Sequence, residues 1–409
     1  MTDAPSNPKS NIVIVGGGLA GAKSAEALRE KGYQGRITLL TAEQHLPYER
    51  PPLSKDYLAG KASFDDAVVH PMTWYAEHEV ELRWGVEVVA VDPANAEVKL
   101  ADESRIGYGA LVLATGSEPR RLPIRGAESA LTLRTREDSD AIRETFGSGK
   151  RLVIIGGGWI GLEVASAARD KGTDVTILEA ADLPLLAVLG REMATVFADL
   201  HRDNGVDLRT GVSISEVTEG AVRLDDGTEF AADAVVMGVG ARPRLELATS
   251  ADLALDNGVL VDGSLRSSNP SIFAVGDIAN HDHPVLGHRV RVEHWATALN
   301  QPATAAAAIL GGADQYEELP YFFSDQFDLG MEYIGHAPTG SYARVVVRGD
   351  LAGRAFVAFW LDPSDRILAA MNVNVWDVVD EIKPLIAGKV PVDHQKLTDP
   401  DTPYAEVGR

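Results

Sequence analysis

Apolar and polar residues follow one succession of patterns near the start of the chain and repeat it further on. A β-branched run at 11–15 leads into a glycine-rich turn, a helical pattern covers 22–30, and a second strand pattern follows at 36–40. These periods predict a strand, a helix and a second strand in that order. The same parts recur at 151–155, 162–171 and 174–178. The chain is therefore predicted to contain an internal repeat of about 130 to 140 residues.

Each repeat continues with short alternating segments and closes on an apolar run. The alternating segments predict antiparallel strands, and the continuous runs are typical of buried parallel strands. Between the first two strands and the alternating segments, the loop 49–55 carries two prolines and is predicted to be rigid and extended. The alternating segments lie at 81–91, 97–100, 221–224 and 229–230, and the apolar runs at 110–114, 234–238 and 271–275.

No third glycine turn follows residue 320. Alternating strands at 343–348, 355–361 and 367–375 precede a helical pattern at 376–386. We therefore predict an α/β protein with two Rossmann-like dinucleotide-binding domains and a small C-terminal α+β domain. The predicted boundaries are 1–116 with 243–320 for the first domain, 117–242 for the second and 321–409 for the third.

The two glycine turns carry the chemistry. They read Gly16-Gly17-Gly18-Leu19-Ala20-Gly21 and Gly156-Gly157-Gly158-Trp159-Ile160-Gly161. In such a turn the first glycine makes the bend, the second admits a pyrophosphate, and the third lets the helix pack on the strand. The helix N-terminus then faces the phosphates. Two such units in one chain indicate two dinucleotides and electron transfer between them.

Composition narrows the class of protein. The 409 residues carry a formal net charge of −22, which disfavours nucleic acid as a partner. There is no cysteine, so disulfides, thiolate metal sites and a protein-bound iron–sulfur cluster of the usual kind are excluded, and we predict no metal site. No apolar run approaches the roughly 20 residues that span a bilayer. With a polar start that lacks the apolar core of a signal peptide, we expect a cytoplasmic protein without a membrane partner.

The motifs resemble those of the two-dinucleotide, glutathione-reductase-like flavoprotein reductases. The resemblance covers almost the whole chain and is strongest to the NADH-dependent ferredoxin reductases of bacterial oxygenase and cytochrome P450 systems. The absence of cysteine argues against the disulfide-reductase branch. The strings that carry the resemblance are 16–21, 50–55 (Arg-Pro-Pro-Leu-Ser-Lys), 113–116 (Leu-Ala-Thr-Gly), 133–135 (Leu-Arg-Thr), 156–163, 274–277 (Ala-Val-Gly-Asp) and 323–326 (Phe-Ser-Asp-Gln).

By this resemblance the first domain, 1–116 with 243–320, binds FAD. An acidic side chain should hold the adenosine ribose after the second strand, where the family's acid aligns with Ala42 and this chain offers Glu43. Asp277 would bind the ribityl chain, and Trp295 would border the isoalloxazine. The residues that the resemblance assigns to FAD are Gly16, Gly18, Ala20, Glu43, Arg50, Lys55, Val88, Thr115, Gly116, Arg134, Asp277 and Trp295.

The second domain, 117–242, would bind NADH. Glu179 ends its second strand, where an acid hydrogen-bonds the ribose 2′-hydroxyl. The resemblance also places Lys55 and Glu163 together beside the flavin and the nicotinamide, as an ion pair that later releases Glu163 to orient the nicotinamide. We take these two as the catalytic residues. The residues assigned to NADH are Gly156, Gly158, Ile160, Gly161, Glu163, Glu179 and Gly240.

The resemblance thus implies an NADH:ferredoxin oxidoreductase that passes single electrons to a [2Fe–2S] ferredoxin. Alternatives are a rubredoxin reductase, an NADH oxidase, or an NADH-sensing flavoprotein of the apoptosis-inducing-factor type. Because the chain is acidic, a local basic patch should receive an acidic ferredoxin. Its candidates are Arg289, Arg291, Arg344, Arg348 and Lys383.

Overall fold

The computed structural model describes residues 11–409, which form two compact units. The first unit comprises residues 11–50, Asp65–Glu118 and Arg242–Pro320. The second comprises Pro51–Phe64, Pro119–Ala241 and Tyr321–Arg409. The second and third predicted domains thus share one unit, together with the segment 51–64, and the boundaries between the three domains stay a prediction.

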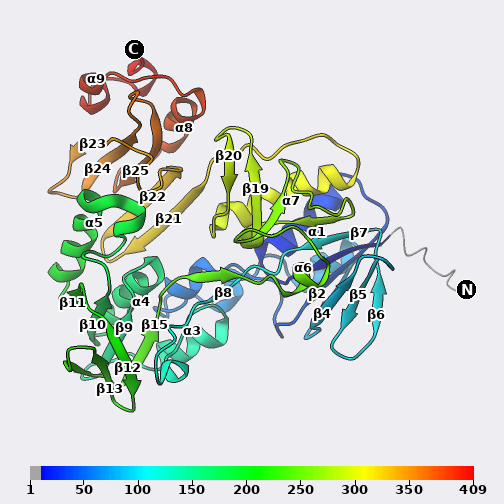
Figure 1. The fold of residues 1–409 in the computed structure, drawn as a ribbon, viewed down its shortest axis with the longest axis horizontal. Coiled ribbons are helices and arrows are strands. Elements are labelled where there is room, and N and C mark those ends of the chain that lie inside the picture. Colours follow the sequence, from blue (N-terminus) through cyan, green and yellow to red (C-terminus); the bar gives the residue numbers. More distant parts are fainter. Residues whose placement is uncertain (1–10) are drawn as a thin grey trace, which may run out of the picture. The chain divides into compact units, whose positions relative to one another are not determined.

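A parallel sheet forms the centre of the first unit (Figure 1). One segment differs from the sequence-based expectation. We predicted antiparallel strands across 81–91. The second half of this range does pair antiparallel with 97–100, but β3 pairs in parallel with β2 at the edge of this sheet, because helix α2 (Met72–Glu77) reverses the chain between them. The spatial order is β18 (Ile272–Ala274), β7 (Ala110–Leu113), β1 (Asn11–Val15), β2 (Arg36–Thr41) and β3 (Val80–Trp84).

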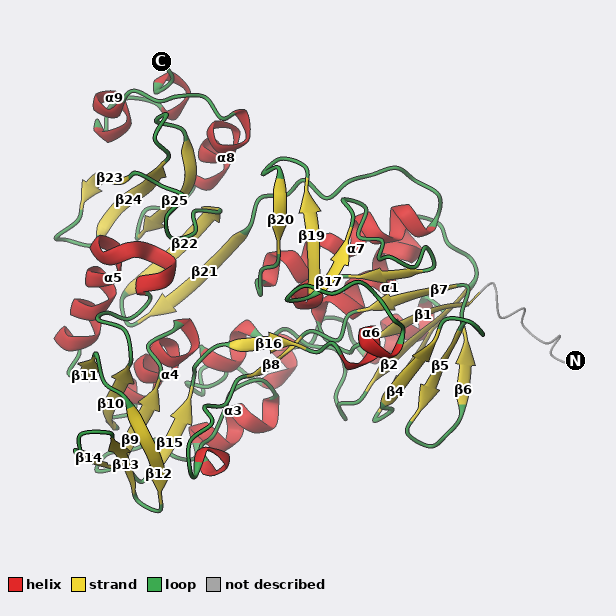
Figure 2. Ribbon diagram, viewed as in Figure 1, coloured by secondary structure: helices red, strands yellow, loops and turns green. Residues whose placement is uncertain are grey.

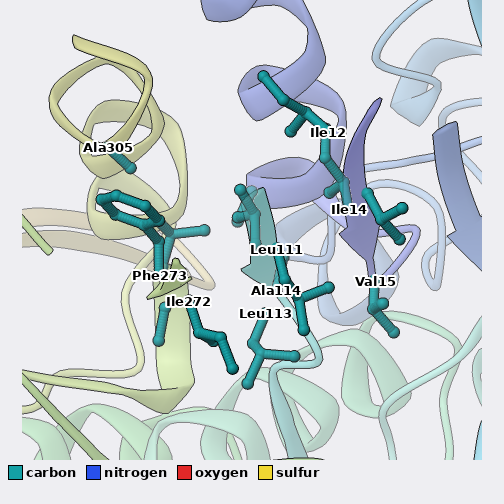
Figure 3. Close-up of a cluster of buried hydrophobic side chains, with 14 of the residues drawn as sticks. Ile12, Ile14, Val15, Leu111, Leu113, Ala114, Ile272, Phe273 and Ala305 are labelled. Carbon is teal, nitrogen blue, oxygen red and sulfur yellow. The ribbon is translucent and has the colours of Figure 1, made fainter. Parts of the chain in front are cut away.

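Helices α1 (Leu19–Glu30) and α7 (Trp295–Ile309) belong to the same unit, and their inner faces complete its core. Figure 3 shows Phe273 of β18 beside Ala305 of α7, with the apolar side chains of β7 and β1 next in line. The remaining elements of this part of the chain are β4 (Val88–Asp92), β5 (Glu97–Leu100), β6 (Arg105–Gly107), β8 (Ser117–Pro119), β16 (Ala241–Pro243), α6 (Glu246–Ser250), β17 (Val259–Val261), β19 (Ala279–His283) and β20 (His288–Val290).

The second unit contains a second parallel sheet, which confirms the predicted repeat. Its antiparallel insert is present as β12 (Ile214–Thr218), β13 (Ala221–Leu224) and β14 (Glu229–Ala231). The parallel strands lie in the order β11 (Asp207–Thr210), β10 (Asp174–Glu179), β9 (Arg151–Ile155) and β15 (Ala234–Met237). The helices of this part are α3 (Arg136–Arg143), α4 (Trp159–Asp170) and α5 (Leu186–Asp203).

An antiparallel sheet with two helices makes up the C-terminal part of the second unit (Figure 2). The helix predicted from residue 376 begins only at Val379, because Asn374 and Asp377 adopt left-handed backbone angles with φ of 50° and 63°. The sheet order is β21 (Tyr321–Gln326), β22 (Leu329–Gly335), β25 (Ile367–Val373), β24 (Ala355–Leu361) and β23 (Arg344–Asp350), and the helices are α8 (Val379–Gly388) and α9 (His394–Thr398).

The proline-rich loop does not run extended, as we predicted. Residues Pro51–Ser54 form a 3₁₀ turn, and further turns continue to residue 60. The fixed φ of proline, about −65°, suits a 3₁₀ turn as well as an extended chain, so the prolines alone could not decide between them. Ser54 ends this turn and Lys55 follows it, and both belong to the second unit.

Buried histidines make the stability of the first unit sensitive to acid. His281 of β19 is 2% exposed, its ring lies 5.1 Å from that of His283, and burial together with the charges of His283 and Arg289 lowers its pKa to about 4. The unfolded chain binds a proton near pH 6.5 and the folded chain does not, so stability is complete above that pH and falls as the pH drops toward 4.

We expect this group to account for about 2 kcal/mol of lost stability at about pH 5. The variant His281→Leu should therefore lose less stability than the parent between about pH 7 and pH 5 in thermal or denaturant unfolding. Equal losses for the two proteins would mean that His281 does not titrate in this way.

Candidate functional site: two dinucleotide turns and a buried ion pair

The first glycine turn has the space that a pyrophosphate needs. A side chain at Gly16, whose φ is +126°, would lie 2.1 Å from the carbonyl oxygen of Ala114, and one at Gly21 would lie 1.9 Å from that of Gly16. At Gly18, which caps helix α1, a Cβ atom would meet nothing within 4 Å. The turn is thus closed on its inner side and open at the helix N-terminus, which fits phosphate binding.

Glu43 follows β2 and forms a half-buried ion pair with Arg50. Its carboxylate accepts hydrogen bonds from the hydroxyl of Tyr48 (2.5 Å) and from Nη2 of Arg50 (2.5 Å). Burial would lower the pKa of Arg50, but Glu43 and Tyr48 outweigh it and hold that pKa above its ordinary value. Arg50 is therefore a fixed positive charge beside the carboxylate. The predicted contacts of Glu43 and Arg50 with FAD stay predictions.

Asp277 lies in a 3₁₀ turn, Gly276–Ile278, that follows β18 in the first unit. It accepts a hydrogen bond from Ser117 Oγ at 2.7 Å, and the preceding Gly276 has a φ of +74° with space for a side chain limited by Ala20, 3.2 Å away. The amide of Gly276 donates to Oε1 of Gln301 at 2.8 Å. Sequence reasoning did not find Ser117 and Gln301, because each lies more than 20 residues from the residue it contacts.

Other residues assigned to FAD are positioned by local contacts. Trp295 is the first residue of α7 and donates from Nε1 to Glu49 at 2.8 Å. Thr115 Oγ1 donates to the carbonyl of Arg244 at 3.2 Å, and Gly116 has a φ of +68°. Val88 begins β4, opposite Leu100. Arg134 belongs to the second unit, where its backbone amide donates to Asp138 at the N-terminus of α3.

The second glycine turn repeats this geometry. A side chain at Gly156 would lie 2.5 Å from the carbonyl oxygen of Gly238, and one at Gly161 would lie 2.3 Å from that of Gly156. At Gly158 the nearest atom is 3.7 Å away, so this turn is also open at the helix N-terminus. Two further residues assigned to NADH are Ile160, an apolar side chain 42% exposed on the first turn of α4, and Gly240, which has a φ of +98°.

Glu179 lies over this turn. Its Oε2 accepts a hydrogen bond from the amide of Gly157 at 2.6 Å, and its Oε1 accepts one from the amide of Ala181 at 2.7 Å. Both bonds hold the carboxylate at the carboxyl end of β10, the edge where ligands bind to a parallel α/β sheet. Of the basic residues that follow, Arg191 is exposed and forms an ion pair with Asp182 at 2.8 Å.

Lys55 and Glu163 form the ion pair that we expected from the resemblance. Lys55 Nζ lies 2.8 Å from Glu163 Oε1, and Glu163 is only 4% exposed on the inner face of α4. Two hydroxyls also donate to this carboxylate: Ser54 Oγ to Oε2 at 2.5 Å and Ser324 Oγ to Oε1 at 2.7 Å. Three donors thus hold one buried carboxylate. The place of this pair beside the reacting rings stays a prediction.

The predicted basic patch is largely engaged in structural contacts. Arg289 donates from Nη1 to two backbone carbonyls, and the side chain of Arg291 is 9% exposed and donates to the carbonyl of Asp277. Arg348 donates to the carbonyls of Thr402 and Pro400. Arg289, Arg291 and Arg348 therefore support loops of their own units, and a charge reversal there would test folding rather than docking.

Two kinds of feature are absent from residues 11–409. No helix in this range combines the length and the apolar character that crossing a bilayer requires. Within the same range, no group of three or more histidine, cysteine, aspartate or glutamate side chains is arranged to hold a metal ion.

Comparison with known proteins agrees with this geometry. Residues 10–302 match the family described as pyridine nucleotide-disulphide oxidoreductase, and residues 321–407 match the family described as reductase C-terminal. The chain is 38% identical to putidaredoxin reductase CamA of Pseudomonas putida, over 98% of this chain and 97% of that protein.

A dioxygenase component and a solved structure are similarly related. The anthranilate 1,2-dioxygenase system ferredoxin–NAD(+) reductase component of Burkholderia cepacia is 39% identical, over 95% of this chain and 97% of that protein. The reductase in the crystal structure of a covalent putidaredoxin reductase–putidaredoxin complex superposes with a TM-score of 0.92 at 37% identity, covering 98% of both chains.

Proposed function

Because this chain belongs to the pyridine nucleotide-disulphide oxidoreductase family, we propose that it is an FAD-dependent NADH:ferredoxin oxidoreductase. The observation that carries this proposal is the pair of open glycine turns, one in each unit, each at the junction of a parallel strand and a helix. Each turn offers one pyrophosphate site, so the chain has room for two dinucleotides. The relatives named as ferredoxin reductases support the choice of electron acceptor.

The first unit supplies the residues that hold FAD in this proposal. Gly16, Gly18 and Ala20 shape the turn that receives the pyrophosphate, at the positive end of α1. Asp277, oriented by Ser117, would bind hydroxyls of the ribityl chain. When bound, FAD accepts a hydride from NADH and returns the electrons one at a time.

The second unit supplies the residues that hold NADH. The turn at Gly156–Gly161 would receive its pyrophosphate, and Glu179 would accept hydrogen bonds from the adenosine ribose. Glu163 would accept a hydrogen bond from the carboxamide of the nicotinamide when Lys55 releases it. Neither Lys55 nor Glu163 needs to transfer a proton, because the hydride chemistry belongs to the two cofactors.

The partner in this proposal is a [2Fe–2S] ferredoxin that serves a cytochrome P450 or a dioxygenase. The relatives include the reductase of a dioxygenase system and one crystallised with putidaredoxin. The net charge of −22 disfavours nucleic acid as a partner. A cytoplasmic location, which we expected from the sequence, belongs to this proposal, and cell fractionation would test it.

Anaerobic stopped-flow mixing tests the acceptor. The purified protein should be yellow with one non-covalent FAD per chain, and NADH should bleach it. Mixing this reduced protein with putidaredoxin as a probe [2Fe–2S] ferredoxin should reoxidise the flavin faster than rubredoxin or dissolved oxygen does. Faster reoxidation by rubredoxin or by oxygen would favour a rubredoxin reductase or an NADH oxidase. A protein that binds no FAD would contradict the proposal altogether.

A further inference from the structure

A series of buried side-chain hydrogen bonds leads from Glu163 into the interior of the second unit. Ser324 Oγ lies 2.7 Å from Glu163 Oε1, Gln326 Nε2 lies 3.0 Å from Ser324 Oγ, and His201 Nε2 lies 2.9 Å from Gln326 Oε1. All four side chains are at most 4% exposed. The series thus connects helix α4 through strand β21 to helix α5. We call it the Glu163 chain.

The chemistry of the four groups gives the Glu163 chain one direction. An ionised carboxylate only accepts hydrogen bonds, so the Ser324 hydroxyl must donate to Glu163. Its oxygen must then accept from the amide nitrogen of Gln326, which leaves the amide oxygen facing His201. That oxygen also only accepts, so His201 must carry its hydrogen on Nε2. Every donor therefore points toward Glu163.

His201 is suited to the end of this chain because it stays neutral. Burial lowers its pKa to about 4, so a single ring hydrogen is present near neutral pH. Its other ring nitrogen, Nδ1, is buried and has no hydrogen-bond partner among the described residues. A buried polar atom without a partner costs stability, and an apolar residue in the core would avoid that cost. A histidine here is therefore less stabilising than an apolar residue would be, which indicates a role other than packing.

We propose that His201 and Gln326 are positioning residues for the hydride transfer, and that they act through Ser324 to hold the carboxylate of Glu163 in place. This inference rests on the proposed role of Glu163 at the nicotinamide. When Lys55 releases the carboxylate, Ser324 remains as a donor to the same oxygen, Oε1. His201 keeps the Gln326 amide from turning over. A turned amide would present its oxygen to Ser324 and draw the hydroxyl hydrogen away from Glu163.

Two substitutions at Gln326 test the direction of the chain. Glu accepts at both ends, so Gln326→Glu takes the Ser324 hydrogen and should slow flavin reduction at saturating NADH by about tenfold. Met offers no strong acceptor, so in Gln326→Met the hydroxyl still donates to Glu163 and the loss should be no more than about threefold. If the residue served only to fill and satisfy the core, the order of the two variants would be reversed.

A double variant separates this effect from that of the added charge. Ser324→Ala removes the donor and should itself slow flavin reduction by about tenfold, with little change in the NADH concentration that half-saturates it. If Gln326→Glu acts through Ser324, the double variant should reduce the flavin less than about twofold more slowly than Ser324→Ala alone. A full additional tenfold loss would show that the charge acts directly and would overturn the proposal.

His201 completes the test with a matched pair. His201→Gln keeps a donor and should stay within about threefold of the parent, whereas His201→Leu should lose about tenfold. Leu200→Ala, a buried change on the same helix, should lower the melting temperature without slowing flavin reduction. If Leu200→Ala slows it as much as His201→Leu does, the effect of His201 is only structural.

The variant Glu163→Gln makes the two proposals distinguishable. Normal flavin reduction in Glu163→Gln would overturn the proposed role of Glu163 and the chain with it. Slow reduction in Glu163→Gln together with normal reduction in Ser324→Ala would overturn the Glu163 chain alone.

Discussion

Replacing Glu163 with Gln is expected to slow reduction of the bound flavin by NADH by about 100-fold, because the side chain no longer provides the carboxylate that would position the nicotinamide. Lys55 Nζ lies 2.8 Å from this carboxylate and would lose its only described carboxylate contact within 4 Å. Lys55→Met should have an effect of similar size, because it leaves the carboxylate buried without its counter-charge. Rapid-scan stopped-flow spectroscopy under anaerobic conditions measures both.

The FAD content should stay normal in both variants, because the first unit holds the residues assigned to its pyrophosphate and ribityl chain. Asp170→Asn is a matched control. Asp170 lies on α4, as Glu163 does, and forms an ion pair at 3.5 Å with Lys61, which lies in the same segment 51–64 as Lys55. Both of these side chains are exposed. An exposed pair contributes little, so flavin reduction should be unchanged. Normal reduction in Glu163→Gln and Lys55→Met would place these residues outside the reacting site.

NADPH is expected to be a poor electron donor, with kcat/KM at least about 100-fold below that for NADH, because like charges in an interface cost several kcal/mol. Glu179 is held over the second glycine turn by two backbone amides, so it cannot easily turn away from a 2′-phosphate. Glu179→Arg should reduce the preference for NADH to less than about tenfold, mainly by weakening the binding of NADH. Steady-state kinetics with both cofactors measures the ratio.

Asp174→Arg is the control for this prediction. Asp174 begins the same strand, β10, at the end opposite to Glu179, and its side chain is 74% exposed. This substitution makes the same change of charge as Glu179→Arg, but away from the ligand-binding edge. It should leave the preference for NADH over NADPH unchanged. Comparable efficiency with NADH and NADPH in the parent protein would contradict the assignment of Glu179.

Local features of this protein could be predicted from the sequence because short segments determine them. The turn at Gly16–Gly21 needs glycines where a Cβ atom would meet a neighbouring backbone atom, and such a need is visible as a motif. The strands on either side are apolar because they are buried in a parallel sheet. The position of Glu179 at the end of a strand follows from the same local pattern.

Contacts between distant segments needed the structure. The order of residues along the chain did not show that β3 returns to the parallel sheet, or that Arg289 and Arg291 are engaged by backbone carbonyls. These features depend on where the chain turns back in space. The proline-rich loop is a similar case, since its 3₁₀ turn and an extended path both satisfy proline.

By itself, then, the sequence determined the two dinucleotide turns and, through its resemblance to a known family, the pairing of Lys55 with Glu163. Only the tertiary structure showed that Ser54 and Ser324 donate to that carboxylate and that Gln326 and His201 continue the series of hydrogen bonds behind Ser324. Ser54, Ser324 and Gln326 lie in the strings 50–55 and 323–326, but those strings do not show what the side chains contact, and His201 lies in no motif. Their role arises because α4, α5 and β21 enclose them where water is excluded and each polar atom must find its partner within the protein.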